Sequence, residues 1–305
     1  MKTSRLAGWS LPRVCLGTGT WPVNPNTQQA DVLTLLHHLL AGPKPLFDTA
    51  PMYGHSQSET WLGGVLREHP RDRYFVASKA GWELLPEGKI EHDLTRDGIR
   101  RSVEGSLKRL GVDFLDIVHL HDPDDRQREA LDVAFPALYE LRDEGVIGAV
   151  GCGMNSWQPL AEFAQHADVD CLLIAGRYTL LEQTARPLLD LCLEKGIPLF
   201  AAGIYNSGVL ATGARNPLTY NYAPPPPDIL ARVQRLEELC AAHGVKLQTA
   251  AAQFPLRHPA IRALVVGAIS VPEFNQTLNA LDQSLPADLW AELLALGLID
   301  TVTRS

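Results

Sequence analysis

Short apolar runs alternate with longer amphipathic segments along the whole chain. The short runs end in a small or polar residue, as buried strands do, and they occupy residues 13–17, 45–48, 73–79, 114–121, 146–151, 169–175, 197–202 and 261–266. Between them apolar residues recur at helical spacing, in residues 27–40, 58–67, 95–110, 128–143, 157–166, 181–195, 228–242 and 271–281. Eight strand–helix alternations in one chain predict a closed (β/α)8 TIM barrel of the α/β class.

The main rival fold is a doubly wound sheet, which usually carries a glycine-rich dinucleotide turn after its first strand. The first predicted strand is followed by Gly17-Thr18-Gly19-Thr20-Trp21-Pro22, so proline stands where the third glycine would be. No internal repeat and no shift in composition marks a domain boundary, and the proline run at residues 224–227 is typical of a stiff spacer in a loop. We therefore expect one barrel domain over residues 1–305.

Composition narrows the class of protein. The chain is 46% hydrophobic and 20% charged, as globular proteins are, and its net charge of −8 argues against a nucleic-acid or anionic-membrane partner. Five scattered cysteines without a C-x-x-C pair indicate a reducing compartment and neither a disulfide framework nor a zinc site. The first 17 residues lack the apolar core of a signal peptide, and no apolar run approaches the roughly 18 residues of a membrane span. A cytoplasmic protein without a resident metal is the expectation.

Ionisable residues end three consecutive predicted strands. They are Asp48, Lys79 and His121, and Tyr53 follows Asp48 by five residues on the loop that leaves its strand. The carboxyl ends of barrel strands converge on one face, where catalytic residues of such barrels lie. Each residue alone would be unremarkable, as a cap, a packed ring, a solvated charge or a loop anchor. Their consecutive order predicts that the four side chains meet at one rim.

Together these four groups make a proton-transfer site. Tyrosine has a pKa near 10 and is a poor acid–base group at neutral pH. A neighbouring lysine ammonium lowers that pKa, and an aspartate keeps the lysine in place and charged. A histidine can then donate a hydrogen bond to the reacting oxygen, while a hydride moves at the adjacent carbon.

Motifs around these residues resemble those of the aldo-keto reductase superfamily. They are residues 47–54 (FDTAPMYG) with Ser58-Glu59, Ser78-Lys79, and residues 116–123 (DIVHLHDP), in the same order and spacing, and the resemblance extends from residues 16–21 (LGTGTW) to residues 267–270 (GAIS). It implies a barrel that holds NAD(P)(H) without a Rossmann domain. It also implies that Tyr53 is the proton donor or acceptor, that Lys79 tunes its pKa, that Asp48 is the partner of Lys79 and that His121 orients the substrate oxygen.

Two further stretches are similar to the bacterial aldose 1-dehydrogenase group, which includes L-fucose and D-threo-aldose dehydrogenases, with L-galactose dehydrogenase and pyridoxal 4-dehydrogenase as relatives. They are residues 173–181 (LIAGRYTLL) and 205–213 (YNSGVLATG). This similarity implies oxidation of the anomeric carbon (C1) of an aldose such as L-fucose, D-arabinose or L-galactose to the lactone. A general aldehyde or ketone reductase and a pyridoxal 4-dehydrogenase are the alternatives within the superfamily.

The resemblance also implies a set of binding residues. Cofactor contacts are expected from Gly19, Thr20, Trp21, Asp48, Gly153, Asn155, Tyr205, Asn206, Ser207, Gly208, Val209, Leu210, Gly267, Ala268, Ser270 and Glu273, with Tyr205 as the ring that stacks on the nicotinamide. Substrate contacts are expected from Trp21, Tyr53, Trp82, His121 and Asp122, with Asp124, Asn155, Tyr220 and Tyr222 nearby.

The chain departs from the family pattern at three of these positions. Ala175 stands where the family has glutamine. Gly267 and Glu273 stand where many NADP-preferring members have lysine and arginine. A carboxylate repels a 2′-phosphate but accepts a hydrogen bond from a ribose hydroxyl, so NAD is the expected cofactor and NADP the alternative.

Three readings from other classes remain beside this one. His119-x-His121 is reminiscent of a metal-dependent amidohydrolase, although the ends of strands five and six lack the further histidines that such a site needs. A Schiff-base aldolase would need a desolvated Lys79, which a neighbouring aspartate disfavours. The third is a regulatory subunit that binds cofactor without turnover. The oligomeric state is left open.

Overall fold

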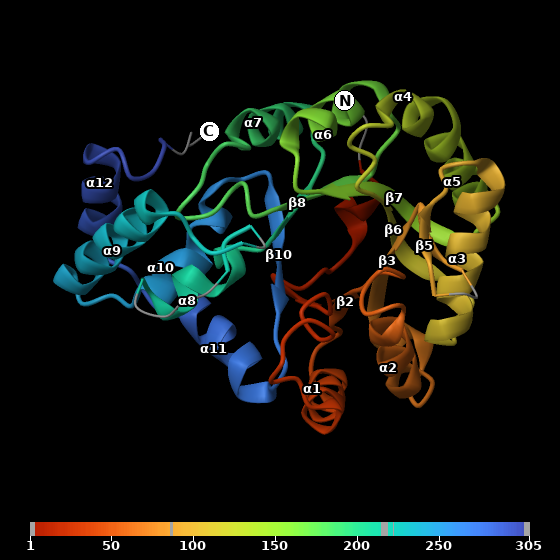
Figure 1. The fold of residues 1–305 in the computed structure, drawn as a ribbon, viewed down its shortest axis with the longest axis horizontal. Helices are drawn as coiled ribbons and strands as arrows, with labels where there is room; N and C mark the ends of the chain where they lie inside the picture. Colours follow the sequence, from red (N-terminus) through yellow and green to blue (C-terminus); the bar gives the residue numbers. More distant parts are fainter. Residues whose placement is uncertain (1–3, 86–87, 215–218, 222, 302–305) are drawn as a thin grey trace.

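The structure is a computed structural model that describes residues 4–85, 88–214, 219–221 and 223–301. Eight parallel strands close into a barrel with the neighbour order β1-β2-β3-β6-β7-β8-β9-β10 (Figure 1). Their bounds are Val14–Gly17 (β1), Leu46–Asp48 (β2), Phe75–Ala80 (β3), Leu115–His121 (β6), Ile147–Met154 (β7), Cys171–Ala175 (β8), Leu199–Ala202 (β9) and Ile261–Gly267 (β10). The predicted (β/α)8 TIM barrel is confirmed.

Helices surround the strands on the outside of the barrel (Figure 1). The longer ones are Gln29–Ala41 (α1), Gln57–Leu66 (α2), Arg96–Leu110 (α3), Phe135–Asp143 (α5), Trp157–His166 (α6), Arg186–Lys195 (α7), Pro227–Ala242 (α9), Leu247–Gln253 (α10), Val271–Leu281 (α11) and Ala287–Ala295 (α12). Two short ones are Gln127–Glu129 (α4) and Val209–Thr212 (α8). No helix in the described residues is long and apolar enough to cross a membrane.

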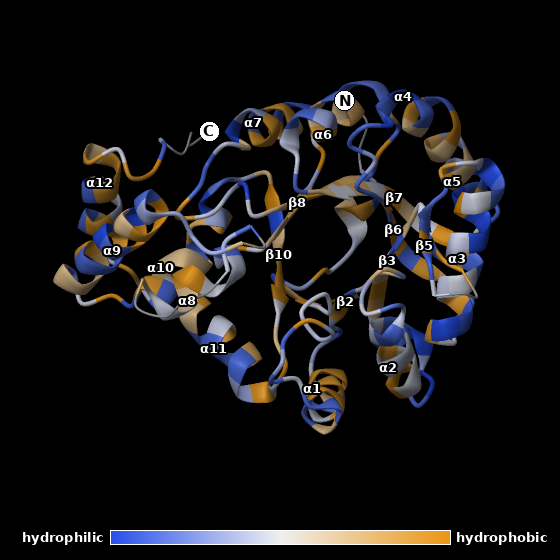
Figure 2. Ribbon diagram, in the orientation of Figure 1, coloured by the Kyte–Doolittle hydropathy of each residue, from blue (hydrophilic) through white to orange (hydrophobic). Residues whose placement is uncertain are grey.

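Strand residues alternate between two hydrophobic clusters, one inside the barrel and one between strands and helices. The inner cluster is smaller and includes Cys15, Ala77, Ile117, Leu173 and Phe200. The outer cluster takes the intervening strand residues and the apolar faces of the helices. Figure 2 shows this as orange strands enclosed by helices whose colours change from turn to turn. Because side chains point alternately to opposite faces of a strand, the inner residues lie two apart along each strand.

Residues at the ends of α3 and α7 cap these helices as the sequence predicts. Thr95 accepts the N–H of Gly98 at the start of α3. Gly111 and Gly196 follow the ends of α3 and α7 in the left-handed conformation that glycine adopts at little cost.

The structure differs from the expected elements in several places. A two-stranded hairpin, Trp82–Leu84 (β4) and Ile90–His92 (β5), lies between β3 and α3, and no alternation in the sequence had indicated it. The helix expected from residue 181 begins only at Arg186, because Thr179 Oγ1 accepts the N–H groups of Leu181 and Glu182 in a turn. β7 extends to Met154, three residues past its expected end, which brings Gly153 into the barrel wall.

Candidate active site

The sheet register brings the strand-end residues to one level inside the barrel. Asp48 pairs with Ala77 across β2 and β3, and Lys79 pairs with His119 across β3 and β6. All of these positions point inward, and Asp48, Lys79 and His121 are 4%, 3% and 7% exposed. The predicted convergence of three ionisable side chains therefore occurs in the fold.

Lys79 and Asp48 form a buried ion pair. Lys79 Nζ donates to Asp48 Oδ1 at 2.7 Å and to the carbonyl of Thr49 at 2.9 Å. Burial by itself lowers the pKa of Lys79, but the Asp48 carboxylate and the Tyr53 phenol outweigh it, so the pKa is raised and the ammonium is retained. Asp48 Oδ2 is buried and has no hydrogen-bond partner in the described protein, which leaves one acceptor at the rim.

Tyr53 lies over this pair. Its ring centroid is 4.8 Å from Lys79 Nζ and 6.1 Å from the His121 ring, which it meets edge-on. Removal from water raises the pKa of Tyr53, and Lys79 lowers it by its charge and by a side-chain hydrogen bond without reversing the rise. Lys79 therefore lowers the pKa of Tyr53 as expected. The pKa is still raised overall, because the loss of water around the phenolate has a larger effect than the lysine charge.

Gly19 makes room for the Tyr53 ring. A Cβ at this glycine would lie 3.2 Å from Tyr53 Cζ, closer than ordinary packing. Gly19 was expected to contact the cofactor, which stays a prediction. In the structure its lack of a side chain allows the Tyr53 ring to lie against its backbone.

The two histidines of β6 are neutral. Burial lowers the pKa of His121 well below its ordinary value and lowers that of His119 to about 3, with Lys79 the next cause for both. His119 lies one layer deeper, edge-on to Phe200, and a Cβ at Gly151 would lie 2.4 Å from its Nδ1. A neutral His121 suits a hydrogen-bond donor to an uncharged oxygen.

Trp82 connects the unexpected hairpin to the site. Its indole Nε1 donates to the carbonyl of His121 at 3.0 Å, and its ring stacks on His92 with centroids 4.3 Å apart. Trp82 is partly exposed beside the barrel mouth. Its expected contact with substrate stays a prediction, and the structure shows that its indole N–H binds the backbone carbonyl of His121.

The opposite side of the mouth carries almost no side chains. The inward positions that end β7, β8 and β9 are Gly153, Ala175 and Ala202, and the two alanines are partly exposed. Gly153 is buried, and a Cβ there would make ordinary van der Waals contact with His119 and Leu173 at 3.7 Å. The ionisable side chains therefore lie on the β2–β3–β6 side of the mouth, and only small residues end β7, β8 and β9 on the opposite side.

A small cleft of about 60 Å³ leads outward from this open side. It is lined by Asn155, Ala175, Gly176, Arg177, Gly203, Asn206, Ser207 and Asn221. Asn206, Ser207 and Gly208 have φ values of 45°, 58° and 101°, a left-handed turn that non-glycine residues seldom adopt. Asn206 keeps this turn in place: it accepts from Thr179 Oγ1 at 2.6 Å and donates to the Gly176 carbonyl at 3.2 Å.

These features fit a nicotinamide dinucleotide. The glycine and alanine side of the mouth has space for the ring, the buried Asp48 Oδ2 and the His121 Nδ1 have no protein partner, and the cleft continues to the turn at residues 206–208. Val209 and Leu210 are fully buried by their side chains, so only their backbone can face a ligand.

Two residues expected to contact ligands are also held by the protein. Trp21 is 1% exposed, donates its indole N–H to the Ala268 carbonyl at 2.8 Å and stacks near Trp61, so its ring is buried in this structure. Tyr205 bonds through its hydroxyl to Thr277 Oγ1 of α11 at 3.0 Å. Its ring is partly buried against the outer cluster, and its stacking on a nicotinamide stays a prediction.

The segment after β10 is a helix cap. Ser270 Oγ accepts the N–H of Glu273 at 3.4 Å, and Glu273 Oε2 accepts the N–H of Ile269 at 2.9 Å. This reciprocal pair is a capping box at the start of α11. Gly267 lies against Thr20, since a Cβ there would be 2.6 Å from Thr20 Cγ2.

Tyr220, which was expected near the substrate, and Asn221 lie on the loop that borders the cleft. Arg177 Nη1 donates to Asn221 Oδ1 at 2.9 Å, and Tyr220 Oη donates to Glu182 Oε2 at 2.8 Å. Asp124 is partly exposed on the loop after β6, two residues beyond Asp122. Tyr222, expected near the substrate, lies outside the described residues.

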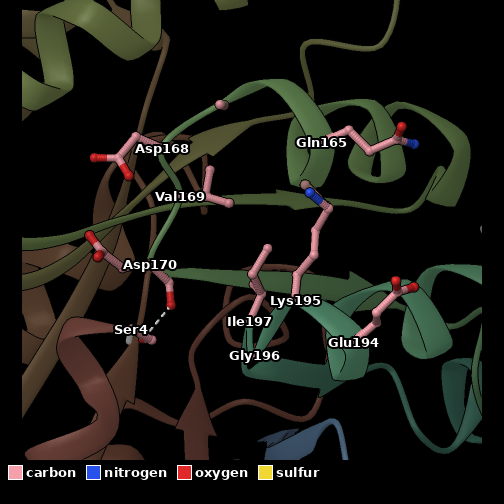
Figure 3. Close-up of a pocket in the computed structure, with 11 residues that line it drawn as sticks. Ser4, Gln165, Asp168, Val169, Asp170, Glu194, Lys195, Gly196 and Ile197 are labelled. Atoms are coloured by element: carbon pink, nitrogen blue, oxygen red, sulfur yellow. Dashed lines mark hydrogen bonds between the residues drawn. The ribbon is translucent and has the colours of Figure 1, made fainter. Parts of the chain in front are cut away.

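A larger cavity, about 360 Å³, lies at the opposite end of the barrel (Figure 3). It is bordered by the segments that precede β8 and β9, among them Val169, Lys195 and Ile197. None of the four predicted catalytic residues lines it. Among the described residues no group of three or more His, Cys, Asp or Glu side chains could hold a metal ion.

Comparison with known proteins assigns this geometry to a family. The profile of the Aldo/keto reductase family matches residues 13–297. The chain is 38% identical to D-threo-aldose 1-dehydrogenase of a Pseudomonas species over 84% of both chains. It is 34% identical to pyridoxal 4-dehydrogenase of Microbacterium luteolum over 95% of both. The holo form of an aldo-keto reductase from Bacillus halodurans superposes with a TM-score of 0.79 at 21% identity, covering 99% of this chain and 97% of that one.

Proposed function

Because the chain belongs to the aldo/keto reductase family, we propose that it oxidises the anomeric C1 of an aldose such as L-fucose, D-arabinose or L-galactose to the lactone, with NAD as hydride acceptor. Family membership itself makes the protein an oxidoreductase that uses a nicotinamide cofactor. The sugar, NAD rather than NADP, and the roles of individual residues are our proposals. A regulatory subunit without turnover is set aside because the named relatives are dehydrogenases.

The observation that supports the proposal is the buried Lys79–Asp48 pair beneath Tyr53 and beside a neutral His121. Tyr53 takes the proton of the C1 hydroxyl during oxidation and returns it during reduction. Lys79 stabilises the phenolate, Asp48 retains the ammonium, and His121 donates to the reacting oxygen. When bound, NAD(P)+ would supply the acceptor for the hydride that leaves C1.

We assign the nicotinamide to the open side of the mouth at Gly153, Ala175 and Ala202, with the amide near Asn155. The turn at Asn206, Ser207 and Gly208 would hold the pyrophosphate through the backbone N–H of Ser207, because the N–H groups of Asn206 and Gly208 already donate to the carbonyls of Gly203 and Tyr205, each at 2.9 Å. The capping box at Ser270 and Glu273 would face the adenosine ribose.

NAD is the proposed cofactor because Glu273 is fixed at the start of α11 by the N–H of Ile269. A 2′-phosphate placed there would meet a carboxylate, and like charges repel. A ribose 2′-hydroxyl would instead donate to the second carboxylate oxygen.

The test combines a substrate panel with the Tyr53→Phe variant. Absorbance at 340 nm is followed with L-fucose, D-arabinose, L-galactose and pyridoxal, each with NAD and with NADP. We expect an aldose with NAD to give the highest kcat/KM. Tyr53→Phe should lower kcat by about 10²- to 10⁴-fold, the usual contribution of a positioned acid–base group, while cofactor affinity measured by fluorescence stays within about threefold. Rates in this variant equal to those of the wild type would contradict the role of Tyr53.

Pyridoxal is the second candidate substrate because the similarity to pyridoxal 4-dehydrogenase covers 95% of both chains. A higher kcat/KM for pyridoxal than for any aldose in the same panel would favour it. Turnover of simple aldehydes alone would indicate a general reductase.

A further inference from the structure

Asp122, the first residue after His121, has a left-handed backbone at the carboxyl end of β6. Its φ of 48° is in the left-handed region, which only a few per cent of non-glycine residues adopt. The N–H of Asp122 donates to the Gly153 carbonyl at 3.2 Å, and the preceding carbonyl accepts from Trp82 at 3.0 Å. Strained residues that the surroundings hold in place cluster at functional sites.

This conformation directs the carboxylate toward the catalytic imidazole. Asp122 Oδ2 is 3.6 Å from His121 Nε2, beyond hydrogen-bond distance, and the side chain is 38% exposed. Within the described part of the chain, no group donates a hydrogen bond to this carboxylate. It is an available acceptor beside the proposed reacting oxygen.

The carboxylate carries a charge at neutral pH. Burial and the nearby Asp124 raise the pKa of Asp122 to about 6, and Lys79 opposes the rise. An ionised carboxylate accepts hydrogen bonds from hydroxyl groups that are stronger than those between neutral groups.

We propose that Asp122 determines specificity by accepting a hydrogen bond from the hydroxyl on the carbon next to the reacting carbon, so that the enzyme prefers 2-hydroxyaldehydes and aldoses to plain aldehydes. The inference rests on the proposed function, since it takes the reacting oxygen to lie at His121 Nε2. A reacting oxygen that accepts from His121 Nε2 would lie about 2.8 Å from that nitrogen. Asp122 Oδ2 lies 3.6 Å from the same nitrogen, so the carboxylate would face the hydroxyl on the carbon next to the reacting carbon.

The closest pair of probes is 2-hydroxypropanal and propanal, which differ only in that hydroxyl. Both are measured as substrates for reduction with NADH at pH 7.5. For the wild type we expect kcat/KM for 2-hydroxypropanal to be at least about tenfold higher, because a hydrogen bond to a charged group discriminates by roughly 10- to 100-fold.

Two variants keep the left-handed backbone while changing the side chain. Asp122→Gly removes the carboxylate, and Asp122→Asn keeps a weaker neutral acceptor; both residue types tolerate positive φ. We expect Asp122→Gly to abolish the preference, with a fall in kcat/KM for 2-hydroxypropanal about tenfold larger than any change for propanal. Asp122→Asn should retain part of the preference. Asp125→Asn removes the same charge from an exposed position on the same loop and should change neither value.

The outcomes separate this inference from the proposed function. A wild type that reduces propanal but shows no preference for 2-hydroxypropanal overturns the role of Asp122 and leaves the oxidoreductase standing. An equal fall for both probes in Asp122→Gly and Asp122→Asn, with folded protein by circular dichroism, also overturns it, because the carboxylate would then act through His121 alone. A wild type that turns over neither probe, nor any sugar of the panel, overturns both proposals.

Discussion

The two ends of this barrel both contain buried aspartates paired with cations, but they use them differently. At the amino-terminal end of the strands, Asp170 Oδ2 accepts from Arg142 Nη1 and from the N–H of Val150, each at 3.0 Å. Asp116 Oδ2 accepts in the same way from Arg71 and from the N–H of Val76, at 2.5 and 2.7 Å. Each carboxylate joins an arginine to the backbone of a neighbouring strand, at Val76 near the start of β3 and at Val150 within β7.

At the carboxyl-terminal end, Asp48 binds only the Lys79 side chain and keeps Oδ2 without a partner. No strand N–H uses this carboxylate in the described structure, and the groups around it are a phenol and a neutral imidazole. Asp170 Oδ1 is likewise buried without a hydrogen bond, so an unpaired oxygen does not distinguish the two ends. The difference lies in the partners: the amino-terminal carboxylates bind strand N–H groups and so link neighbouring strands, whereas Asp48 binds the Lys79 ammonium beneath Tyr53.

Cavity size alone would point to the wrong end. The cavity of about 360 Å³ at the amino-terminal end is larger than the cleft of about 60 Å³ beside Asn206. Figure 3 shows the charged side chains of Asp168, Glu194 and Lys195 beside Val169 and Ile197 around it. The backbone carbonyl of Asp170 accepts from Ser4 Oγ there at 2.7 Å. The convergence of acid–base groups, not the volume, identifies the site.

The largest expected effect is that of removing the cation at the carboxyl-terminal end. Lys79→Met should lower the rate of oxidation on the order of 10³-fold at pH 7. The ammonium lowers the pKa of Tyr53, so its loss raises that pKa further. Because oxidation needs the phenolate, the rising limb of its pH–rate profile should move to higher pH, and pH-dependent kinetics at 340 nm would detect this.

Lys195→Met is the matched control, since Lys195 lines the cavity at the other end. It should leave both the rate and the pH profile unchanged. A pH profile in Lys79→Met that superposes on that of the wild type would mean that Lys79 does not act through the phenol.

The next effect is on stability, at the amino-terminal end. Asp170→Ala leaves the Val150 N–H without its acceptor and removes one of the two carboxylates bound to Arg142, whose side chain is 6% exposed and keeps Asp168 Oδ2 at 2.8 Å. The free energy of unfolding should fall by about 1–3 kcal/mol, the usual cost of leaving a buried group unpaired, while kcat at 25 °C stays within about twofold. Urea unfolding followed by circular dichroism measures it. If Asp170→Ala instead removes activity without loss of stability, the contrast between the two ends is incorrect.

The smallest effects come from two glycines of β7 that are two residues apart. A Cβ at Gly151 would lie 2.4 Å from His119 Nδ1 and 2.9 Å from the Cys171 carbonyl. Gly151→Ala should therefore destabilise the protein by about 1–3 kcal/mol, as overpacking does. A Cβ at Gly153 meets nothing closer than 3.7 Å, so Gly153→Ala should keep its stability.

Gly153→Ala should instead weaken cofactor binding by about tenfold, because the methyl group fills the side of the mouth assigned to the nicotinamide. Titration of NADH fluorescence compares it with the wild type. An unchanged affinity for NADH in Gly153→Ala would mean that the nicotinamide does not bind beside β7.

Much of the site could be predicted because its residues end strands. Asp48, Lys79 and His121 each follow a recognisable apolar run, and in a parallel barrel the end of a strand and the inward direction of its last residue are properties of that strand alone. Tyr53 could be placed with them because it lies only five residues beyond Asp48, on the loop that leaves β2. Directions of side chains outside the strands could not be predicted in this way. Trp21 and Tyr205 were expected to contact ligands, and their hydrogen bonds to Ala268 and Thr277 were not expected.

The sequence by itself determined the alternation of eight strands and helices, the order of the acid–base groups along them and the absence of a large side chain at Gly153, Ala175 and Ala202. Tertiary structure decided the link from Trp82 to the His121 carbonyl, the strained backbone of Asp122 and the burial of Trp21. The features that the sequence determined follow from the repeat of apolar residues within a single strand, every two residues, or a single helix, every 3.6 residues. The features that tertiary structure decided depend on contacts between residues 39 to 247 positions apart, which exist only once the barrel has closed.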